Sequence, residues 1–597
     1  MSRIDKSTVI TRALFSCVLW ATVQACSEGV PGLGSASPVA SKQASGMAAP
    51  LSDATFESLP VDEQYQSVNK LLATLYSGVS VADFYALDTG SALVHRRSDA
   101  PTLGSIRDRL QINLPATERK LLDQQIIGDD AALDAQGNAA PIEGLYRFDR
   151  NKPKQMPLAR IFHYPLSRDM FSQWIAWHLA NTILFSPAEE LDSADLTDVQ
   201  NLFRRLDLSI MAGESIRSMV AVHQHSVENW RRFRSPEDNT REMMEIYLGI
   251  FDNDEEVPLA SQACQDLYLT DERDGYKLAY TDYPNSQPVL VLDRYVTNCR
   301  DFYDVIASHP LLIPRVVDVL VDYFFAGRSA EDRAGIAAAI SASNPVTFED
   351  IFVTILFSEN YLLDTERARS FEESFLPMAK RLQWDAHADV FKGMISGSGS
   401  LGRANLSQMG WSSMTYKLGR VAAIPLDTLS FGNYHKALRE SLMLDSNRWK
   451  WNLGVQAPQP PEPEPVPELP ADASVRDATA HAEALQVYEQ TLAEMTTESR
   501  QIYDVELAEY QQANKLYLQM NDLTVRQLID YVFLGAVQRR ADEIERGDLI
   551  QLLDSQSHLD AEFDNQFVRE GRLDDVTLIL MDYLSRLPEL YFLNRMR

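Results

Sequence analysis

Hydrophobic residues recur every three or four positions along most of this chain, the spacing of an amphipathic helix. Apolar residues follow this spacing from Asp62 to Leu75, and Ser80 stands where it would cap a following helix. The stretch from Glu237 to Gly249 has the same signature, with an apolar stripe of Met243, Met244 and Ile246. The pattern predicts a mainly α fold, arranged as a multi-helical, repeat-like bundle.

A helical unit occurs more than once in the sequence, which indicates one supersecondary module used repeatedly. One copy runs from Val319 to Leu362, and a second runs from Leu528 to Phe592. A fainter third begins at Trp177 and leads to Val220. Each copy is an apolar helix, a short turn whose polar residues cap the next helix, and a further apolar helix ending near an aromatic residue. Chance similarity among amphipathic helices is the alternative interpretation.

The helical period fails between Val257 and Cys299, where β-leaning residues are separated by turn residues. We expect a small hairpin formed by Tyr276–Tyr283 and Pro288–Leu292. Cys264 and Cys299 form an even pair, and we expect a disulfide between them. It would close a loop of roughly 35 residues and stabilise the fold by about 3–4 kcal/mol in the chain-entropy model. A metal site is disfavoured, because CxxC spacing and nearby histidines are missing.

Proline density marks a boundary late in the chain. Gln456 to Asp472 holds so many prolines that we expect a semi-rigid polyproline spacer. From Ser474 to about Gln519 the pattern predicts one long helix or a helix pair, packed against the last repeat copy. The body is therefore expected to divide into a main helical domain (51–455) with two repeat copies, a spacer (456–473) and a C-terminal part (474–597).

The first residues have the form of an export signal. Three basic residues precede a short apolar run from Ala13 to Val23, as in a signal peptide of residues 1–25. The sequence Val23-Gln24-Ala25-Cys26 resembles a bacterial lipobox, which implies lipidation of Cys26; ordinary cleavage near Ala25 is the alternative. A Ser/Gly/Ala/Pro-rich tether (26–50) follows, and Ser27 resembles the outer-membrane sorting pattern. We expect a periplasmic or extracellular protein that meets the membrane only through this lipid.

The length of the chain indicates how many domains it forms, and its net charge indicates which partners are excluded. At 597 residues the chain is long enough for roughly two to four domains. Its net charge of −30 argues against nucleic acid or an anionic lipid surface as partner, because both would be repelled.

Several motifs, in order, resemble the bacterial exported helical family called domain of unknown function 1800. The segment Thr240-Arg241-Glu242-Met243-Met244-Glu245-Ile246, followed by Gly249, occupies the family's A-R-E-L-M-E-L region. His178 matches the histidine of F-W-x-x-H, His309 matches x-H-P, and Gly410-Trp411 resembles a later G-W. The resemblance covers roughly residues 60 to 450 and implies a helical, exported protein without assigning a reaction. Exported helical-module proteins of planctomycete type are the competing resemblance.

The polar residues that match family positions are His178, Glu242, Glu245 and His309. Carboxylates at i and i+3 of one helix, joined by histidines from others, could hold a divalent metal or act in acid/base catalysis. The alternative is structural: Arg241 pairs with Glu245 along the helix, and Glu242 accepts bonds from another helix. We therefore predict no cofactor. The alternative is a divalent metal ion bound by these residues. The pair His223 and His225 is a poor metal site, because i and i+2 point to different helix faces.

Together these features favour a helical interaction or assembly scaffold at the cell envelope. The alternative function is a metal-assisted or acid/base enzyme built from the four residues above. The family resemblance also implies an exported sulfatase-like protein as partner.

Overall fold

The computed structural model describes residues 47–86, 95–127, 160–180, 182–184, 196–233, 235–251, 253–272, 275–281, 287–382, 459–466, 474–521, 525–557, 579–580, 582–593 and 596. The signal peptide, Cys26, almost all of the tether and Gly410-Trp411 lie outside these residues, as does most of the proline-rich spacer. The described residues from Ala48 onward belong to one compact unit.

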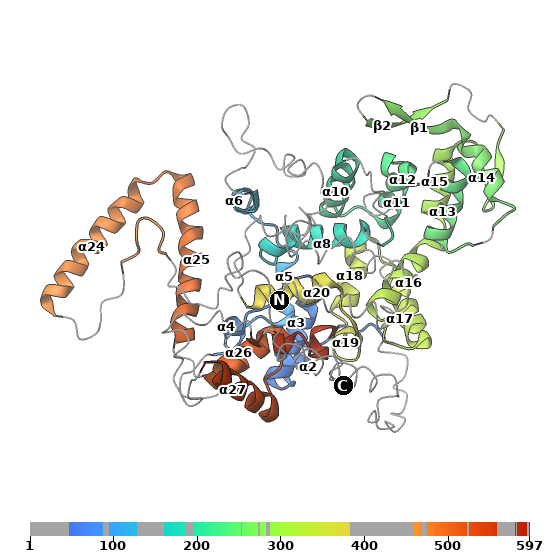
Figure 1. Cartoon of the computed structure of the whole chain (residues 1–597). Coiled ribbons are helices and arrows are strands. Elements are labelled where there is room, and N and C mark those ends of the chain that lie inside the picture. The colour runs from blue at the N-terminus through green and yellow to red at the C-terminus, as the bar shows by residue number, and fades with distance from the viewer. Residues whose placement is uncertain are drawn as a thin grey trace, which may run out of the picture. The chain divides into compact units, whose positions relative to one another are not determined.

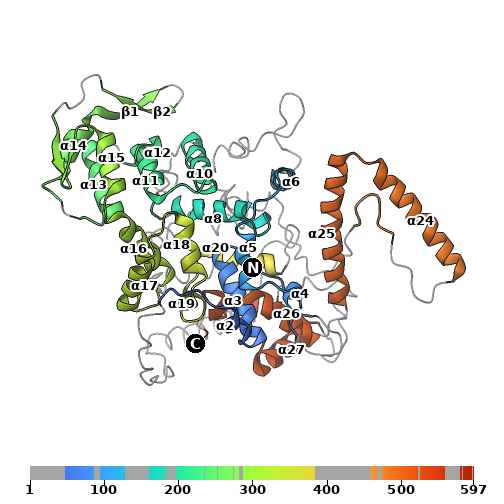
Figure 2. The same cartoon turned by 180° about the vertical axis from the view of Figure 1, so that it is seen from behind.

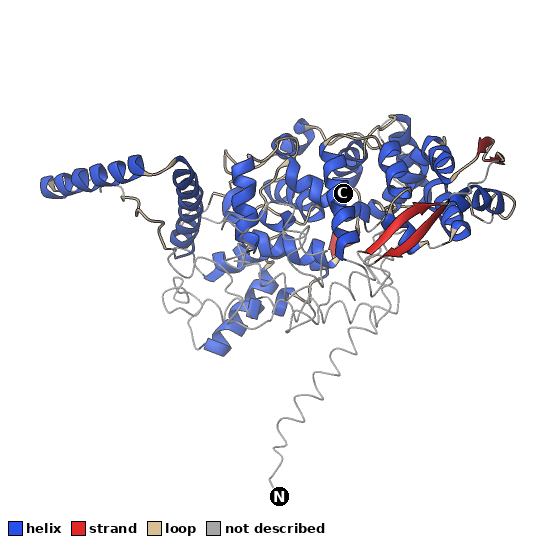
Figure 3. Cartoon of the chain, turned by 90° about the horizontal axis from the view of Figure 1, so that it is seen from above, coloured by secondary structure: helices blue, strands red, loops and turns tan. Residues whose placement is uncertain are grey.

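The described residues are mainly helical, as the pattern predicts, with three short antiparallel strand pairs (Figure 3). In the first half the helices are α2 (Asp53–Glu57), α3 (Val61–Thr74), α4 (Val81–Phe84), α5 (Leu103–Arg109), α6 (Ala116–Ile127), α8 (Arg168–Ala180), α10 (Leu196–Met211), α11 (Ile216–Gln224), α12 (Val227–Arg232), α13 (Pro236–Leu248) and α14 (Val257–Ala263). Then follow α15 (Cys299–Ser308), α16 (Leu312–Phe324), α17 (Ala330–Ala342), α18 (Phe348–Leu356), α19 (Glu359–Leu362), α20 (Phe371–Arg381), α24 (Val475–Glu494), α25 (Thr497–Asn521), α26 (Val525–Val537) and α27 (Glu543–Ser557). Short 3-10 helices are η3 (Cys264–Asp266) and η5 (Pro588–Leu590). Within this part of the chain, no helix combines the length and apolar character that crossing a bilayer requires.

Side-chain caps explain where many helices begin. The Ser80 hydroxyl accepts a hydrogen bond from the Asp83 amide at the start of α4, which confirms the predicted cap. At α18 and α20 a full capping box is present, with Thr347 and Ser370 as the cap residues. Local sequence therefore specifies where these helices begin.

The core joins the beginning of the described chain to its end. α3 is almost wholly buried and packs against α20. α26 packs against both α20 and α4, so these helices lie together in both views (Figure 1, Figure 2). The strands β5 (Arg367–Ala368) and β6 (Phe592–Leu593) pair with each other, about 225 residues apart in sequence. The C-terminal elements thus complete the same hydrophobic core as α3.

The two stronger repeat copies share a specific ion pair. In the first copy Arg333 of α17 binds Asp322 of α16 at 2.9 Å, and in the second Arg546 of α27 binds Asp530 of α26 at 3.0 Å. Each arginine also donates to a backbone carbonyl five residues before it, that of Arg328 or Ala541. The antiparallel pair β5–β6 then joins the segment that follows the first copy to the end of the second copy. Matching contacts at matching positions support one module used twice.

The region tied by cysteines contains two hairpins, and the single hairpin that we expected is wrong in its pairing. β1 (Leu267–Glu272) pairs with β2 (Gly275–Tyr280), and β3 (Val289–Val291) pairs with β4 (Arg294–Val296). The second hairpin turns at Leu292 and Asp293, both of which have positive φ. That geometry is a two-residue primed turn, usually formed by Asn-Gly, so Leu292-Asp293 is not a pattern that predicts it. The Cys264–Cys299 disulfide is present, with both residues buried, and links η3 to the first residue of α15.

The stretch after the proline spacer forms a helix pair, α24 and α25, drawn in orange in Figure 1. We expected it to pack against the last repeat copy. Instead α24 has no buried residue over its 20 positions. Its sequence is rich in alanine and charged residues, which favour a helical conformation even when the helix buries no side chain.

Candidate functional site

The helix that carries the family-like motif is α13. Ser235 caps its start, Pro236 occupies the first turn, and Gly249 ends it in the left-handed conformation with φ of +68°. Met243 and Met244 are fully buried, as predicted, whereas Ile246 is only half-buried. The helix packs against α14, α15 and α16.

The charged residues of this motif, Arg241, Glu242 and Glu245, are half-buried. We expected Arg241 to pair with Glu245, but its ion-pair partners are Glu237 at 3.5 Å and Asp254 at 3.6 Å. Both partner carboxylates are largely exposed, so solvent screens the pairs.

His178 occupies a different setting, inside an aromatic cluster. Its ring stacks between Trp174 and Phe324, with ring centroids 5.3 Å and 5.2 Å away. The edges of Tyr323 and Phe352 close the other sides. The side chain is 1% exposed, so access from solvent is closed. This histidine packs α8 against α16 and α18.

His309 ends α15 and is half-buried. Its Nδ1 accepts a hydrogen bond from the Leu311 amide at 3.2 Å, and its carbonyl accepts one from the Arg217 guanidinium. Burial and the nearby Arg217 lower the pKa of His309, which favours the neutral ring.

The four candidate residues thus come from two neighbourhoods that share α16. His178 contacts α16 through Tyr323 and Phe324, while α13 and α15 also pack against α16. Among the described residues, no three His, Cys, Asp or Glu side chains are grouped to hold a metal ion. The metal-assisted or acid/base site stays a prediction.

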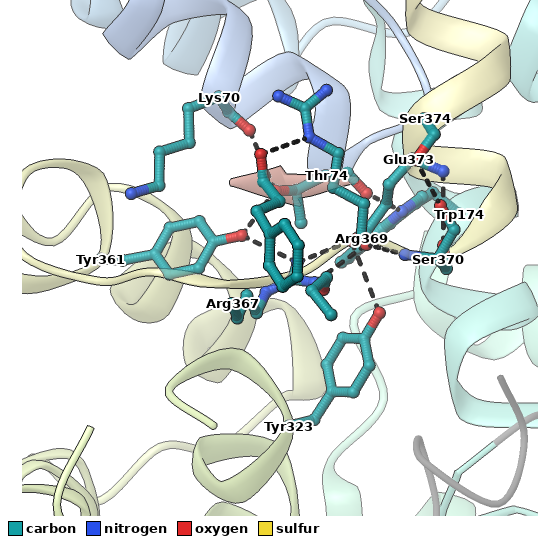
Figure 4. Close-up of polar contacts among 12 residues, drawn as sticks. Lys70, Thr74, Trp174, Tyr323, Tyr361, Arg367, Arg369, Ser370, Glu373 and Ser374 are labelled. Carbon is teal, nitrogen blue, oxygen red and sulfur yellow. Dashed lines mark hydrogen bonds and ion pairs between the residues drawn. The ribbon is translucent and has the colours of Figure 1, made fainter. Parts of the chain in front are cut away.

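A buried ionic cluster, which sequence reasoning missed, lies at the junction of the core elements (Figure 4). Its centre is the ion pair of Arg367 and Glu373 at 2.6 Å, with side chains 0% and 1% exposed. Arg367 also donates to the Tyr361 hydroxyl at 3.0 Å, and that hydroxyl lies 2.5 Å from Thr74 Oγ1. We call the set of these four residues, with Lys70, Tyr323, Arg369 and Ser370, the Arg367–Glu373 cluster.

The outer members of the cluster bind backbone groups. Lys70 Nζ donates to the Thr365 carbonyl at 2.5 Å, and the Ser370 amide donates to Glu373 at 2.8 Å. Arg369 donates to the Phe592 carbonyl at 3.1 Å and to the Gln538 amide oxygen at 2.8 Å. Nearby, Arg381 donates to the carbonyls of Gly535 and Ala536 at the end of α26. The cluster therefore joins α3, the end of the first repeat copy and the C-terminal segment.

Burial sets the charge states in the cluster. Burial acts to lower the pKa of Arg367, but the interactions with Glu373, Tyr361 and Tyr323 together outweigh it and hold that pKa well above its ordinary value. Burial, together with Arg367 and Arg369, lowers the pKa of Lys70. Burial raises the pKa of Tyr361, so its hydroxyl stays protonated. A paired guanidinium suits a structural role when its terminal nitrogens have fixed acceptors, and both Nη1 and Nη2 of Arg367 have them.

The two hairpins present apolar side chains to solvent. Leu290 and Tyr295 face each other across β3 and β4 and are 47% and 76% exposed. Tyr268 of β1 and Tyr280 of β2 are also exposed. The Tyr280 hydroxyl lies 2.5 Å from Nε2 of His225, which fixes the direction of the ring. Tyr268 pairs with Ala279 and Tyr280 pairs with the buried Leu267, so these two rings point to opposite faces of their hairpin. We call the opposing pair of Leu290 and Tyr295 the hairpin surface.

Comparison of the chain with protein-family models, curated proteins and solved structures finds no match. The resemblance described from the sequence motifs stays a prediction.

Proposed function

We propose that this protein is an exported, lipid-anchored interaction scaffold of the cell envelope, and that it binds a partner protein through the hairpin surface. Its members are hydrophobic or aromatic and are held on a short, cross-linked frame. Tyrosine is enriched in protein interfaces, because its ring buries a large area while the hydroxyl retains a polar contact.

One observation carries the proposal most strongly: the cross-strand pair of Leu290 and Tyr295. An opposing pair in an antiparallel ladder lies on one face, where its side chains usually pack on each other and on a core. In β3–β4 the neighbouring pair of Val289 and Val296 takes the inner side, with Val296 fully buried. Leu290 and Tyr295 therefore face solvent, and covering them would give a partner protein an apolar anchor.

Two further features support export. The Cys264–Cys299 disulfide is of the kind that persists in an oxidising compartment such as the periplasm. The first 26 residues have the charge, length and cysteine of a lipoprotein signal. From the family resemblance we propose that the partner is an exported sulfatase-like protein.

The test compares two double variants of the full chain. Leu290→Lys with Tyr295→Lys alters the hairpin surface, and Val346→Lys with Ile544→Lys makes the same change at two exposed apolar residues elsewhere. When the proteins are extracted from the envelope, we expect the unmodified protein and the control to form a complex heavier than the single mature chain. The hairpin variant should have the mass of the chain alone by light scattering. Equal masses for both variants would contradict the proposal.

A further inference from the structure

The helix α24 has no buried residue, and its local sequence favours both its start and its helical conformation. A capping box formed by Ser474 and Asp477 starts it, and five alanines favour its conformation. In proteins, most of the stability of a helix comes from packing of its apolar face rather than from helix propensity. Packing against another surface would therefore stabilise α24.

One side of α24 already has neighbours. The Tyr488 hydroxyl lies 2.7 Å from the Tyr503 hydroxyl of α25, and the Tyr503 hydroxyl donates to the Pro463 carbonyl at 2.9 Å. These contacts set the orientation of α24 about its axis relative to α25.

A heptad seam runs beside that side. Apolar residues occur at alternating spacings of three and four, the positions through which one helix packs on another. These residues are Val475, Ala478, Ala482, Leu485 and Leu492. Val475 is 86% exposed, Leu485 is 39% exposed, and both alanines are exposed. Within the described residues this is an open seam on a preformed helix.

Charge indicates which kind of helix would cover the seam. The heptad position between Leu485 and Leu492 is Glu489, so a covering helix must place a group beside a carboxylate. α24 holds four acidic residues and a single arginine, and α25 is also acidic. A second copy of this chain, with a net charge of −30, would bring like charges together. A helix with lysine or arginine beside its apolar positions would instead gain complementary contacts.

We infer that α24 is a docking site for a cationic amphipathic helix of another protein, which packs its apolar stripe on the Val475–Leu492 seam and sets a basic side chain against Glu489. The seam is separate from the hairpin surface. A failure of one interaction therefore leaves the other intact.

The test uses the full chain in detergent and two synthetic 21-residue peptides with leucine at the heptad core positions. One peptide carries lysine at every flanking position and the other carries glutamate. We expect the lysine peptide to bind, by fluorescence anisotropy, and the glutamate peptide not to bind. Equal binding of both peptides, or of neither, would overturn the inference.

Two substitutions on the same helix separate docking from general charge attraction. Leu485→Glu places a carboxylate in the seam, whereas Val487→Glu places the same charge at a position that is 65% exposed and outside the seam. Docking predicts that Leu485→Glu weakens binding of the lysine peptide by about tenfold or more, while Val487→Glu changes it by less than about twofold. If the two variants bind the lysine peptide equally well, or both bind it more tightly than the unmodified chain does, only net charge governs binding and the inference is wrong.

A third variant tests the charge assignment. Glu489→Lys should weaken the lysine peptide and allow the glutamate peptide to bind, because the sign at the centre of the seam is reversed. An unchanged preference would contradict the role of Glu489. Self-association of the unmodified chain that Leu485→Glu abolishes would also overturn the inference, in favour of a second copy as the occupant. Circular dichroism confirms that each variant stays folded.

Discussion

The Arg367–Glu373 pair shows how a few buried charges can tie distant segments together. Glu373 accepts bonds from Arg367, from the Ser370 amide and, at 3.4 Å, from the Tyr323 hydroxyl. Removing one partner of a buried pair leaves a charge without compensation, which typically costs several kcal/mol. Each member of the pair is therefore needed to compensate the buried charge of the other.

We predict that Glu373→Gln lowers the free energy of unfolding by about 3–5 kcal/mol, since it leaves the Arg367 guanidinium buried beside a neutral amide. The matched control is Glu237→Gln, which removes an exposed partner of Arg241 and should cost less than about 1 kcal/mol. Urea denaturation of both variants provides the comparison. Similar costs would contradict the structural role of the cluster.

A buried histidine gives a separate prediction about pH. Burial, followed by the charges of Arg205 and Arg232, lowers the pKa of His223 well below 6.5, and Arg205 lies 3.4 Å from its Nδ1. Just below pH 6.5 the unfolded chain therefore binds a proton that the folded chain does not. Stability contributed by this residue falls as the pH drops through that window, by at most about 1.4 kcal/mol per pH unit. His223→Gln should flatten the dependence of unfolding free energy on pH between 5 and 6.5, and an unchanged slope would refute this.

Some of these residue contacts could be predicted and others could not. The Ser80 cap and the cysteine pair depend on short-range rules or on counting, so the sequence sufficed for both. The contact of Thr74 with Tyr361 spans 287 residues, and nothing local distinguishes it. Arg241 forms ion pairs with Glu237 and Asp254 rather than with Glu245, because several carboxylates lie within reach of its flexible side chain.

The repeat copies are helical elements that could be predicted from the sequence. The sequence predicted the copies from their patterns, and the matching bridges Asp322–Arg333 and Asp530–Arg546 support that interpretation. Each copy also carries a glycine after the shared aspartate, Gly327 or Gly535. A β-carbon on Gly327 would overlap the Glu366 carbonyl, and one on Gly535 would overlap the Leu382 side chain. Close packing at the turn after α16 and in the last turn of α26 therefore requires glycine in both copies.

We predict a graded response to alanine at three glycines. Gly327→Ala should destabilise the protein by about 1–3 kcal/mol or more, because a backbone carbonyl cannot move aside. Gly535→Ala should cost less, since the Leu382 side chain can rotate. Gly547→Ala in α27 meets open space and should stabilise the protein by about 0.5–1 kcal/mol. Thermal unfolding measures all three, and a different order would contradict this packing.

The hairpins mark the limit of pattern-based prediction for elements. A β-leaning region and its disulfide were predicted, but the strand partners were not. Pairing depends on turn geometry, and the turn at Leu292-Asp293 uses residues that seldom adopt positive φ. In the same way, helical periodicity predicted α24 but could not show that it would lack buried residues.

The C-terminal part of the described chain packs against its first helices, since α26 contacts α4 and Arg540 forms an ion pair with Asp62 at 3.3 Å. Composition indicated the proline-rich spacer, but not that the chain beyond it would complete the core around α3. That closure depends on contacts between segments hundreds of residues apart, which one sequence does not reveal.

Anchoring gives a prediction for the complete protein. If Cys26 carries the lipid, Cys26→Ser should move the protein from the membrane fraction to the soluble fraction, because no other part of the sequence is expected to hold it there. Cell fractionation with immunoblotting measures the shift, and Cys17→Ser, within the expected signal peptide, is the matched control. Persistence of Cys26→Ser in the membrane fraction would contradict lipid anchoring.

The most direct test of the scaffold proposal is photo-crosslinking in intact cells from a benzophenone amino acid at position 295, compared with the same amino acid at position 346. Both positions are exposed, but only Tyr295 belongs to the hairpin surface. The proposal predicts one discrete adduct with a second protein from position 295 and none from position 346. No adduct at position 295, or the same products from both positions, would contradict it.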